Sequence, residues 1–383
     1  MKTAAKSLVC AILCMSSALV LASCSGGPAA SPLPTAQGAS SVFSAPQSAS
    51  PQNARLKKCR PGAKHCRREP LLSSLSIYVP NSFSTEGTVT IYPASVTGNV
   101  LPTATIAGPN TQLGPAASVA FDAAGNLYVR NRRGCNEFGA NESVAVFAPG
   151  ATGNVAPIRS ISGPNTGLMA SVNNLDGMAF DSAGNLYVAN PGANVLIFAP
   201  GANGNVAPKS VLNNVAPAGI AIDSSDRLYV TGFVGVIGGG IEVFAAGASG
   251  NATPINTIAG NLTGLSLPVG VALDGHGNIY VSDLGAGKIF VFAPTASGNV
   301  PPIETISGSN TKLFEPAGIA LDANGTVYES DLSGQVLTYA PGAFGNVAPS
   351  TDITGTNTRL SVPGLLALHD APLLMHGNPP VRR

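Results

Sequence analysis

Five aspartates recur at equivalent places along the chain, and repeated carboxylates could act as acids, bases or metal ligands. They are Asp122, Asp181, Asp223, Asp274 and Asp322. In four of the five copies a Gly stands three residues after the Asp. An Asp with this spacing begins a type I turn, in which its side chain accepts a backbone N–H and the Gly takes a positive φ. We therefore interpret these carboxylates as turn residues, and we predict neither a metal site nor a cofactor.

The aspartates belong to a unit that repeats over most of the chain. Each is followed by a segment close to Gly-Asn-Leu-Tyr-Val, and the Tyr of this unit recurs about every 50 residues, with a partial first copy at Tyr78. A Phe or Tyr seven residues before an Asn occurs six times. Self-similarity at this period, built from strand-like and turn-like pieces, is typical of a β-propeller with one blade per repeat. The six repeats predict six blades.

Each complete repeat predicts four antiparallel strands, because apolar and small or polar residues alternate in runs rich in β-branched and aromatic residues. Examples, in strand order, are Pro316 to Asp322, Asn185 to Val188, Ile289 to Phe292 and Pro157 to Ile161. The succession Pro-x-Gly-Ile-Ala-x-Asp, Gly-Asn-Leu-Tyr-Val and Ile-x-Val-Phe resembles the NHL-repeat family of six-bladed propellers. The resemblance covers all six repeats and implies an all-β, six-bladed β-propeller.

The two ends of the repeat array are incomplete in complementary ways. Leu75 to Val79 begins with a second-strand pattern and has no first strand before it. Pro363 to His369 is a first-strand pattern, with His369 in place of the Asp and no further repeat after it. We therefore predict that Leu366 to Leu368 pairs with Leu75 to Val79, so that the C-terminal strand completes the N-terminal blade and leaves no open sheet edge.

Loop lengths distinguish the two faces of the predicted ring. The turns after the first and third strands have a constant length, whereas the loops after the second and fourth strands vary. Binding residues concentrate on variable loops of a rigid scaffold. We therefore expect any ligand on the variable face, near residues 130–142, 171–176 and 232–240. The candidate ligand-binding residues are Arg132, Arg133, Asp176 and Glu315.

The N-terminus has the features of an exported lipoprotein. Lys2 and Lys6 precede an apolar run that is too short to span a bilayer, which is typical of a signal peptide. Residues 21–24, Leu-Ala-Ser-Cys, resemble the bacterial lipobox, which implies that Cys24 is lipidated after residues 1–23 are removed. The alternative is an ordinary secretory signal with a chance Cys. Ser25 after the Cys implies, by resemblance to lipoprotein sorting, the outer membrane of a host with two membranes.

The segment between this leader and the repeats predicts a disordered tether, because it is rich in Ser, Ala, Pro and Gln. Its basic stretch, Arg55 to Glu69, either binds an anionic surface or keeps the linker soluble. Cys59 and Cys66 flank a Pro-Gly pair, and we expect a disulfide between them in preference to a metal site. Cys135 is open to burial, to a free thiol or to pairing with either of them. The predicted segments are a signal peptide (1–23), a tether (24–70), the propeller (71–370) and a tail (371–383).

A tethered propeller without a clear catalytic constellation indicates a non-enzymatic binding or scaffold module of the cell envelope. We expect a monomer held to the lipid bilayer through Cys24, with a protein or small molecule as ligand and no nucleic-acid partner. The alternative is a metal-dependent enzyme, because six-bladed relatives include gluconolactonase-like hydrolases and lyases. A site for such a cation needs several converging oxygen ligands.

Overall fold

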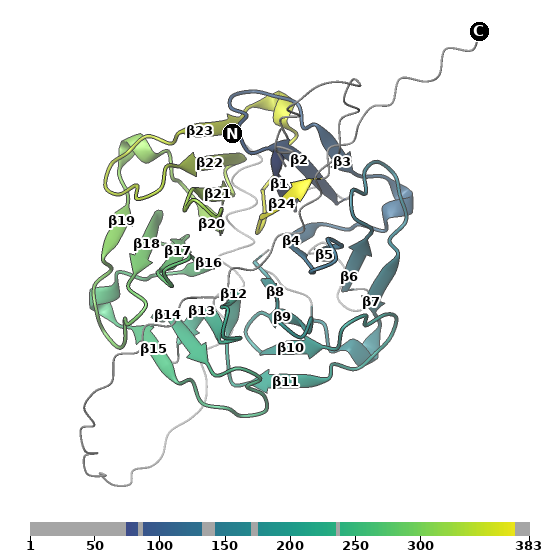
Figure 1. The fold of residues 1–383 in the computed structure, drawn as a ribbon, viewed down its shortest axis with the longest axis horizontal. Helices are drawn as coiled ribbons and strands as arrows, with labels where there is room; N and C mark the ends of the chain where they lie inside the picture. The colour runs from purple at the N-terminus through teal and green to yellow at the C-terminus, as the bar shows by residue number, and fades with distance from the viewer. Residues whose placement is uncertain (1–73, 83–86, 132–141, 170–174, 235–237, 372–383) are drawn as a thin grey trace, which may run out of the picture. The chain divides into compact units, whose positions relative to one another are not determined.

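The computed structural model describes residues 74–82, 87–131, 142–169, 175–234 and 238–371. Within these ranges, six antiparallel four-stranded sheets are arranged as blades around a common axis (Figure 1), which confirms the predicted six-bladed propeller. Apart from five single 3₁₀ turns, the described residues contain no helix. Accordingly, none of these residues forms a helix that is long and apolar enough to cross a membrane.

Each blade runs from the axis outward in strand order. Blade 1 consists of β24 (Ala367–Ala371), β1 (Ser74–Asn81), β2 (Thr88–Pro93) and β3 (Ala104–Ile106). Blade 2 consists of β4 (Ala116–Phe121), β5 (Leu127–Asn131), β6 (Ser143–Phe147) and β7 (Arg159–Ser162). Blade 3 consists of β8 (Met178–Phe180), β9 (Leu186–Asn190), β10 (Asn194–Phe198) and β11 (Ser210–Asn213).

The second half of the ring repeats the arrangement. Blade 4 consists of β12 (Pro217–Ile222), β13 (Leu228–Val234), β14 (Gly238–Phe244) and β15 (Asn256–Ala259). Blade 5 consists of β16 (Pro268–Leu273), β17 (Ile279–Asp283), β18 (Lys288–Phe292) and β19 (Glu304–Ile306). Blade 6 consists of β20 (Pro316–Leu321), β21 (Val327–Asp331), β22 (Gln335–Tyr339) and β23 (Thr351–Thr354).

The chain ends close the ring as the sequence predicts. β24 pairs antiparallel with β1, with Leu368 opposite Ile77 and Ala367 opposite Tyr78. The N-terminal blade therefore receives its innermost strand from the C-terminal end of the repeats (Figure 1).

The repeated aspartates cap the turns between first and second strands. Oδ1 of Asp122 accepts the backbone N–H groups of Ala124 and Asn126, at 3.0 and 2.9 Å. Gly125 has a φ of +79°, and Asp226, which replaces the Gly in blade 4, has a φ of +59°. The corresponding bonds form at Asp181, Asp223, Asp274 and Asp322. These side chains therefore have the turn role that their spacing predicts.

Aromatic side chains form the core between neighbouring blades. The residues that end the third strands are at most 1% exposed: Tyr92, Phe147, Phe198, Phe244, Phe292 and Tyr339. The six repeated tyrosines of the second strands are also buried. Burial of one such side chain stabilises a fold by about 2 kcal/mol, so the repeated aromatic positions supply much of the adhesion between blades.

The Gly-Asn pair that follows each of these aromatic residues forms hydrogen bonds to the preceding blade, and we call this contact the clasp. The Gly153 N–H donates to Thr105 O (2.7 Å), on the outer edge of β3, and Gly153 O accepts the N–H of Ala107. Oδ1 of Asn154 accepts the N–H of Asn110, in the 3₁₀ turn η1 (Pro109–Thr111). A parallel bridge of this kind crosses all six blade boundaries. The clasp therefore covers the outer edge strand of every blade, which would otherwise be free to pair with another chain.

Candidate functional site: a buried ion cluster between blades 2 and 3

Two sets of equivalent residues meet at the blade boundaries on the variable face, and each set has one charged member. Two residues after the repeated Tyr stand Pro80, Arg130, Ala189, Thr231, Ser282 and Ser330. Five residues before the turn Asp, or before His369, stand Ala117, Asp176, Ala218, Val269, Ala317 and Gly364. Arg130 and Asp176 are the charged members, and they come from adjacent blades.

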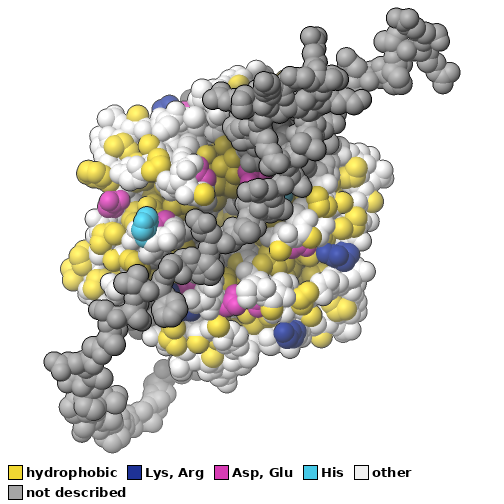
Figure 2. All heavy atoms as spheres, viewed as in Figure 1, with side chains coloured by type: hydrophobic (Ala, Val, Ile, Leu, Met, Phe, Trp, Pro, Cys, Tyr) yellow, Lys and Arg dark blue, Asp and Glu magenta, His cyan; other side chains and the backbone are white. Residues whose placement is uncertain are grey.

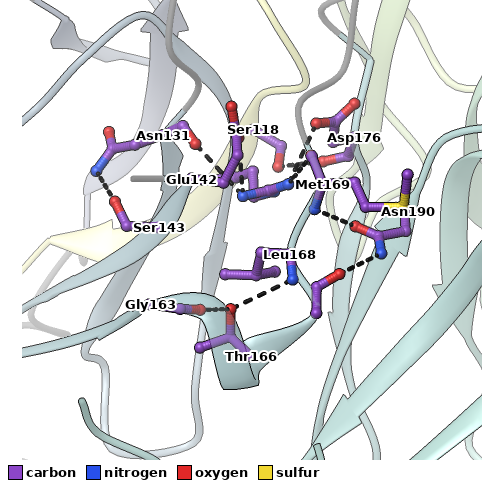
Figure 3. Close-up of polar contacts among 12 residues, drawn as sticks. Ser118, Asn131, Glu142, Ser143, Gly163, Thr166, Leu168, Met169, Asp176 and Asn190 are labelled. Atoms are coloured by element: carbon purple, nitrogen blue, oxygen red, sulfur yellow. Dashed lines mark hydrogen bonds and ion pairs between the residues drawn. The ribbon is translucent and has the colours of Figure 1, made fainter. Parts of the chain in front are cut away.

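The structure brings these two residues together in one cluster with Glu142 (Figure 3). Nη1 of Arg130 lies 3.2 Å from Oε2 of Glu142, and Nη2 lies 3.8 Å from Oδ2 of Asp176. Nη2 also donates to Met169 O at 2.9 Å. The side chains of Arg130 and Asp176 are fully buried, and that of Glu142 is 8% exposed. Removing one partner from such a buried set costs about 3–5 kcal/mol, because a desolvated charge loses its counter-charge.

Ser118 shows how blade 2 accommodates the arginine. In blades 4, 5 and 6 a second-strand hydroxyl donates to the first strand of the next blade, from Thr231, Ser282 and Ser330 to the carbonyls of Val269, Ala317 and Gly364. The first strand beside that hydroxyl carries Gly, and a Cβ at Gly318 would lie 2.4 Å from Ser330 Oγ. Blade 2 has Arg130 instead of the hydroxyl, so Ser118 fits in place of the Gly and donates to Asp176 O at 2.5 Å. In blade 2 the hydroxyl is thus on the first strand instead of the second, and the hydrogen bond to the next blade is preserved.

The cluster fastens the ends of two variable loops. Asn131 and Glu142 border the loop 132–141, and Nδ2 of Asn131 donates to Ser143 Oγ at 3.2 Å. Met169 and Asp176 lie at the ends of the loop around 170–174, and the Met169 N–H donates to Oδ1 of Asn190 at 3.1 Å (Figure 3). These two loops are the longest of their kinds in the repeats. The charged cluster therefore links residues at the ends of both loops.

The structure places Asp176 and Glu315 in different parts of the ring. Asp176 precedes β8 of blade 3, whereas Glu315 precedes β20 of blade 6, three blades away. Glu315 is half-buried, its N–H donates to Oδ2 of Asp331 at 2.9 Å, and burial and the Asp331 carboxylate raise its pKa. A central cavity of about 420 Å³ is lined by first-strand residues such as Val119, Met178 and Ile319. Neither Asp176 nor Glu315 lines it, so these two side chains do not converge on the channel.

The other sequence candidates lie outside the described residues. They are Arg132, Arg133, Cys24, Cys59 and Cys66, and Cys135 lies outside them as well. Among the residues that the structure does describe, no three His, Cys, Asp or Glu side chains are grouped so that they could hold a metal ion.

Glu329 is a buried acid that the sequence analysis did not single out. It follows the repeated Tyr of blade 6, where the corresponding residues are Val79, Val129, Val188, Val230 and Val281. Its side chain is fully buried, and Oε1 accepts the N–H of Ala317 at 3.1 Å. Burial, and secondarily the negative charge of Asp331, raises its pKa well above the usual value. Glu329 is therefore held in its neutral form, in contrast to the ion cluster of blade 2.

The fold and this site define a six-bladed β-propeller with a buried ion cluster at one blade boundary of its variable face. No protein-family model matches the chain, and no curated protein matches its sequence. Among solved structures, the chain is similar to a protein of unknown function from Bacteroides caccae, with a TM-score of 0.53, 10% identity, and coverage of 77% of this chain and 98% of that one. A streptogramin B lyase structure matches with a TM-score of 0.41, 12% identity, and coverage of 65% and 72%. At these identities the likeness concerns the fold alone.

Proposed function

We propose that the chain is an NHL-type propeller that is anchored to the cell envelope through Cys24 and acts as a non-enzymatic binding module. Its ligand or partner binds the variable face over the boundary between blades 2 and 3. If the segment between Cys24 and β1 is a flexible tether, it would reach roughly 35–40 Å, which would hold the propeller clear of the lipid headgroups.

One observation carries the placement of the binding surface. The two longest variable loops, 132–141 and 170–174, belong to adjacent blades and share the Arg130 cluster as their base. Binding residues concentrate on variable loops of a rigid scaffold. The other blade boundaries have short hydroxyl bonds or small residues at the positions of Arg130 and Asp176. This boundary is therefore the best candidate for recognition.

The anchor is tested in a bacterial host that expresses the full chain or its Cys24→Ala variant. We expect the unaltered chain in the membrane fraction and in the detergent phase after phase separation, whereas Cys24→Ala becomes soluble. Equal membrane association of the two would contradict lipidation at Cys24.

The binding surface is tested by photo-crosslinking in the same cells. A photoreactive residue replaces Asn136 in the loop 132–141 or, as a control, the exposed Ala183 in a turn of the other face. We expect a discrete adduct from position 136 and none from position 183. Adducts from both positions, or from position 183 alone, would reject this surface.

The non-enzymatic role is tested by thermal melting of the full chain with Ca²⁺, Mn²⁺ or Zn²⁺. A specifically bound ion must raise the stability of the folded state. We expect no change in melting temperature, and a saturable rise with any of the three ions would favour a metal-dependent enzyme.

A further inference from the structure

A second cavity lies between blades 6 and 1, on the face that carries the short turns. Its volume is about 790 Å³. Its polar lining residues are Ser95, Asp322, Asn324, Thr326, Tyr328, Thr338, His369 and Asp370. Two of them are carboxylates, and none of the described residues around the cavity is Lys or Arg. On the face in view in Figure 2, the Lys and Arg side chains lie apart from one another.

In blades 2 and 4 an arginine side chain lies beside the repeated Tyr that corresponds to Tyr328. In blade 2, Nη2 of Arg159 donates to the hydroxyl of Tyr128 at 2.8 Å, and its Cζ lies 6.0 Å from the centre of the Tyr128 ring. In blade 4, Cζ of Arg227 lies 5.8 Å from the centre of the Tyr229 ring, and its Nε donates to Oδ2 of Asp223 at 2.7 Å. A guanidinium therefore lies beside the repeated Tyr twice within this chain, and in blade 4 it also pairs with the turn Asp.

Blade 6 has the Asp322 and Tyr328 pair without an arginine of its own. Thr351 occupies the register position of Arg159, because Thr338 pairs with Thr351 as Val146 pairs with Arg159. Thr326 stands two residues before Tyr328, which is the position of Arg227 relative to Tyr229. In blades 2 and 4 an arginine reaches the repeated Tyr from one of these two positions, and in blade 6 both positions have short side chains. The cavity beside Tyr328 therefore has room for a guanidinium that the chain does not supply.

A buried hydroxyl in the cavity wall is an independent sign of a missing partner. Thr338 is 4% exposed and lines the cavity, and its Oγ1 has no hydrogen-bond partner among the described residues. The residues at this position in blades 2 to 5 are Val146, Ile197, Val243 and Val291. A buried hydroxyl without a partner destabilises the fold, because it has lost its hydrogen bonds to water. A ligand N–H that donates to this oxygen would remove that cost.

We propose that this cavity binds a small guanidinium compound. Its N–H groups donate to the carboxylates of Asp322 and Asp370 and to Oγ1 of Thr338, and its central carbon lies over the Tyr328 ring as the Cζ atoms of Arg159 and Arg227 lie over theirs. His369 does not oppose the cation, because burial lowers its pKa and leaves the imidazole neutral at pH 7. The proposal concerns the opposite face from the loops 132–141 and 170–174 and is independent of the proposed function.

The test is a ligand-observed NMR titration of the full chain with ethylguanidinium. Ethylurea serves as the neutral compound of the same shape, and tetramethylammonium as a cation without N–H donors. We expect saturable one-site binding of ethylguanidinium and at least tenfold weaker binding of both controls. Equal binding of ethylurea, or no saturable binding of ethylguanidinium, would overturn the proposal.

Matched variants locate the site. Asp322→Asn and Asp274→Asn change equivalent turn residues of blades 6 and 5, so they perturb their turns alike. We expect about tenfold weaker binding in Asp322→Asn, from the loss of one charge-assisted contact, and unchanged binding in Asp274→Asn. Thr351→Arg places a guanidinium where blade 2 has one and should abolish binding without lowering the melting temperature. Equal binding by the two Asn variants, or full binding by a folded Thr351→Arg chain, would also refute the site.

Discussion

Blades 2 and 6 have the same four strands, yet they depart from the repeat in opposite ways. Blade 2 adds a buried arginine, Arg130, that is paired with carboxylates on the variable face, and it fills its other end with Arg159 over Tyr128. Blade 6 adds a buried acid, Glu329, that is kept neutral, and it leaves the place of Arg159 to a threonine and a cavity. In both blades, changes at fixed register positions replace the pattern of the other repeats with a different arrangement of buried ionisable groups.

The largest expected effect concerns the boundary between blades 6 and 1, which depends on the chain end. A chain that stops after Ser361 lacks β24, so blade 1 loses its innermost strand and its partner residues. We expect the loss of cooperative unfolding, measured by circular dichroism during chemical denaturation. A chain that stops after Ala371 is the control and should unfold like the full chain. Equal unfolding of the two truncated chains would reject the closure.

The next effect concerns the ion cluster of blade 2. Arg130→Ala removes the cation between two buried carboxylates and should lower the free energy of unfolding by about 3–5 kcal/mol. The triple variant Arg130→Ser, Ser118→Gly and Asp176→Ala recreates the arrangement of Ser282, Gly270 and Ala317 at the boundary of blades 5 and 6. It should recover part of the loss in a denaturant titration, because the buried Asp176 carboxylate is removed together with Arg130, whereas Glu142 stays. A triple variant no more stable than Arg130→Ala would contradict this exchange.

Glu329 predicts a pH dependence that blade 2 does not share. The unfolded chain releases this proton near the usual Glu pKa, whereas the folded chain retains it, because burial raises the pKa in the folded state. Stability is therefore greatest below the usual pKa and falls, by about 1.4 kcal/mol per pH unit, as pH rises toward the raised value. Glu329→Gln keeps an acceptor for the Ala317 N–H and should remove this fall. Parallel curves of stability against pH for the two chains would exclude a neutral Glu329.

The smallest expected effect concerns the clasp, which is the same in blades 2 and 6. Asn154 of blade 2 and Asn346 of blade 6 each accept a backbone N–H of the preceding blade at 2.8 Å. Replacement of either by Ala should cost about 1 kcal/mol, the usual net value of such a bond. The two losses should agree within error in denaturant titrations. A clear inequality would mean that the difference between blades 2 and 6 extends to their outer edges.

Short sequence patterns predict the number of blades, the strands and the closure, because each of these features depends on residues that are close together in the sequence. Alternating residues mark a strand, Asp122 and Gly125 mark a turn, and the unmatched patterns at Leu75 and Leu366 mark the two halves of one blade. These features need no knowledge of distant contacts. The strand ends that the sequence predicts therefore agree with the structure to within a few residues.

The site was less predictable because its contacts join different blades. Asp176 was identified by its place at the start of a first strand, but its partner Arg130 was not, since the pairing crosses a blade boundary. A signal existed, because each is the charged member of its set of equivalent positions. The clasp at Asn154 was hidden in the same way, since a constant spacing indicates a turn and does not reveal a partner in the preceding blade. Arg132, Arg133 and the tether cysteines remain predictions.

The pairing of β24 with β1 sets the order in which the molecule can be completed during synthesis. β24 follows every other described strand in the sequence, yet it is the innermost strand of blade 1. Until residue 371 has been synthesised, β1 has no strand on its inner side and the ring stays open between blades 6 and 1. Closure of the ring therefore waits for the last of the described strands.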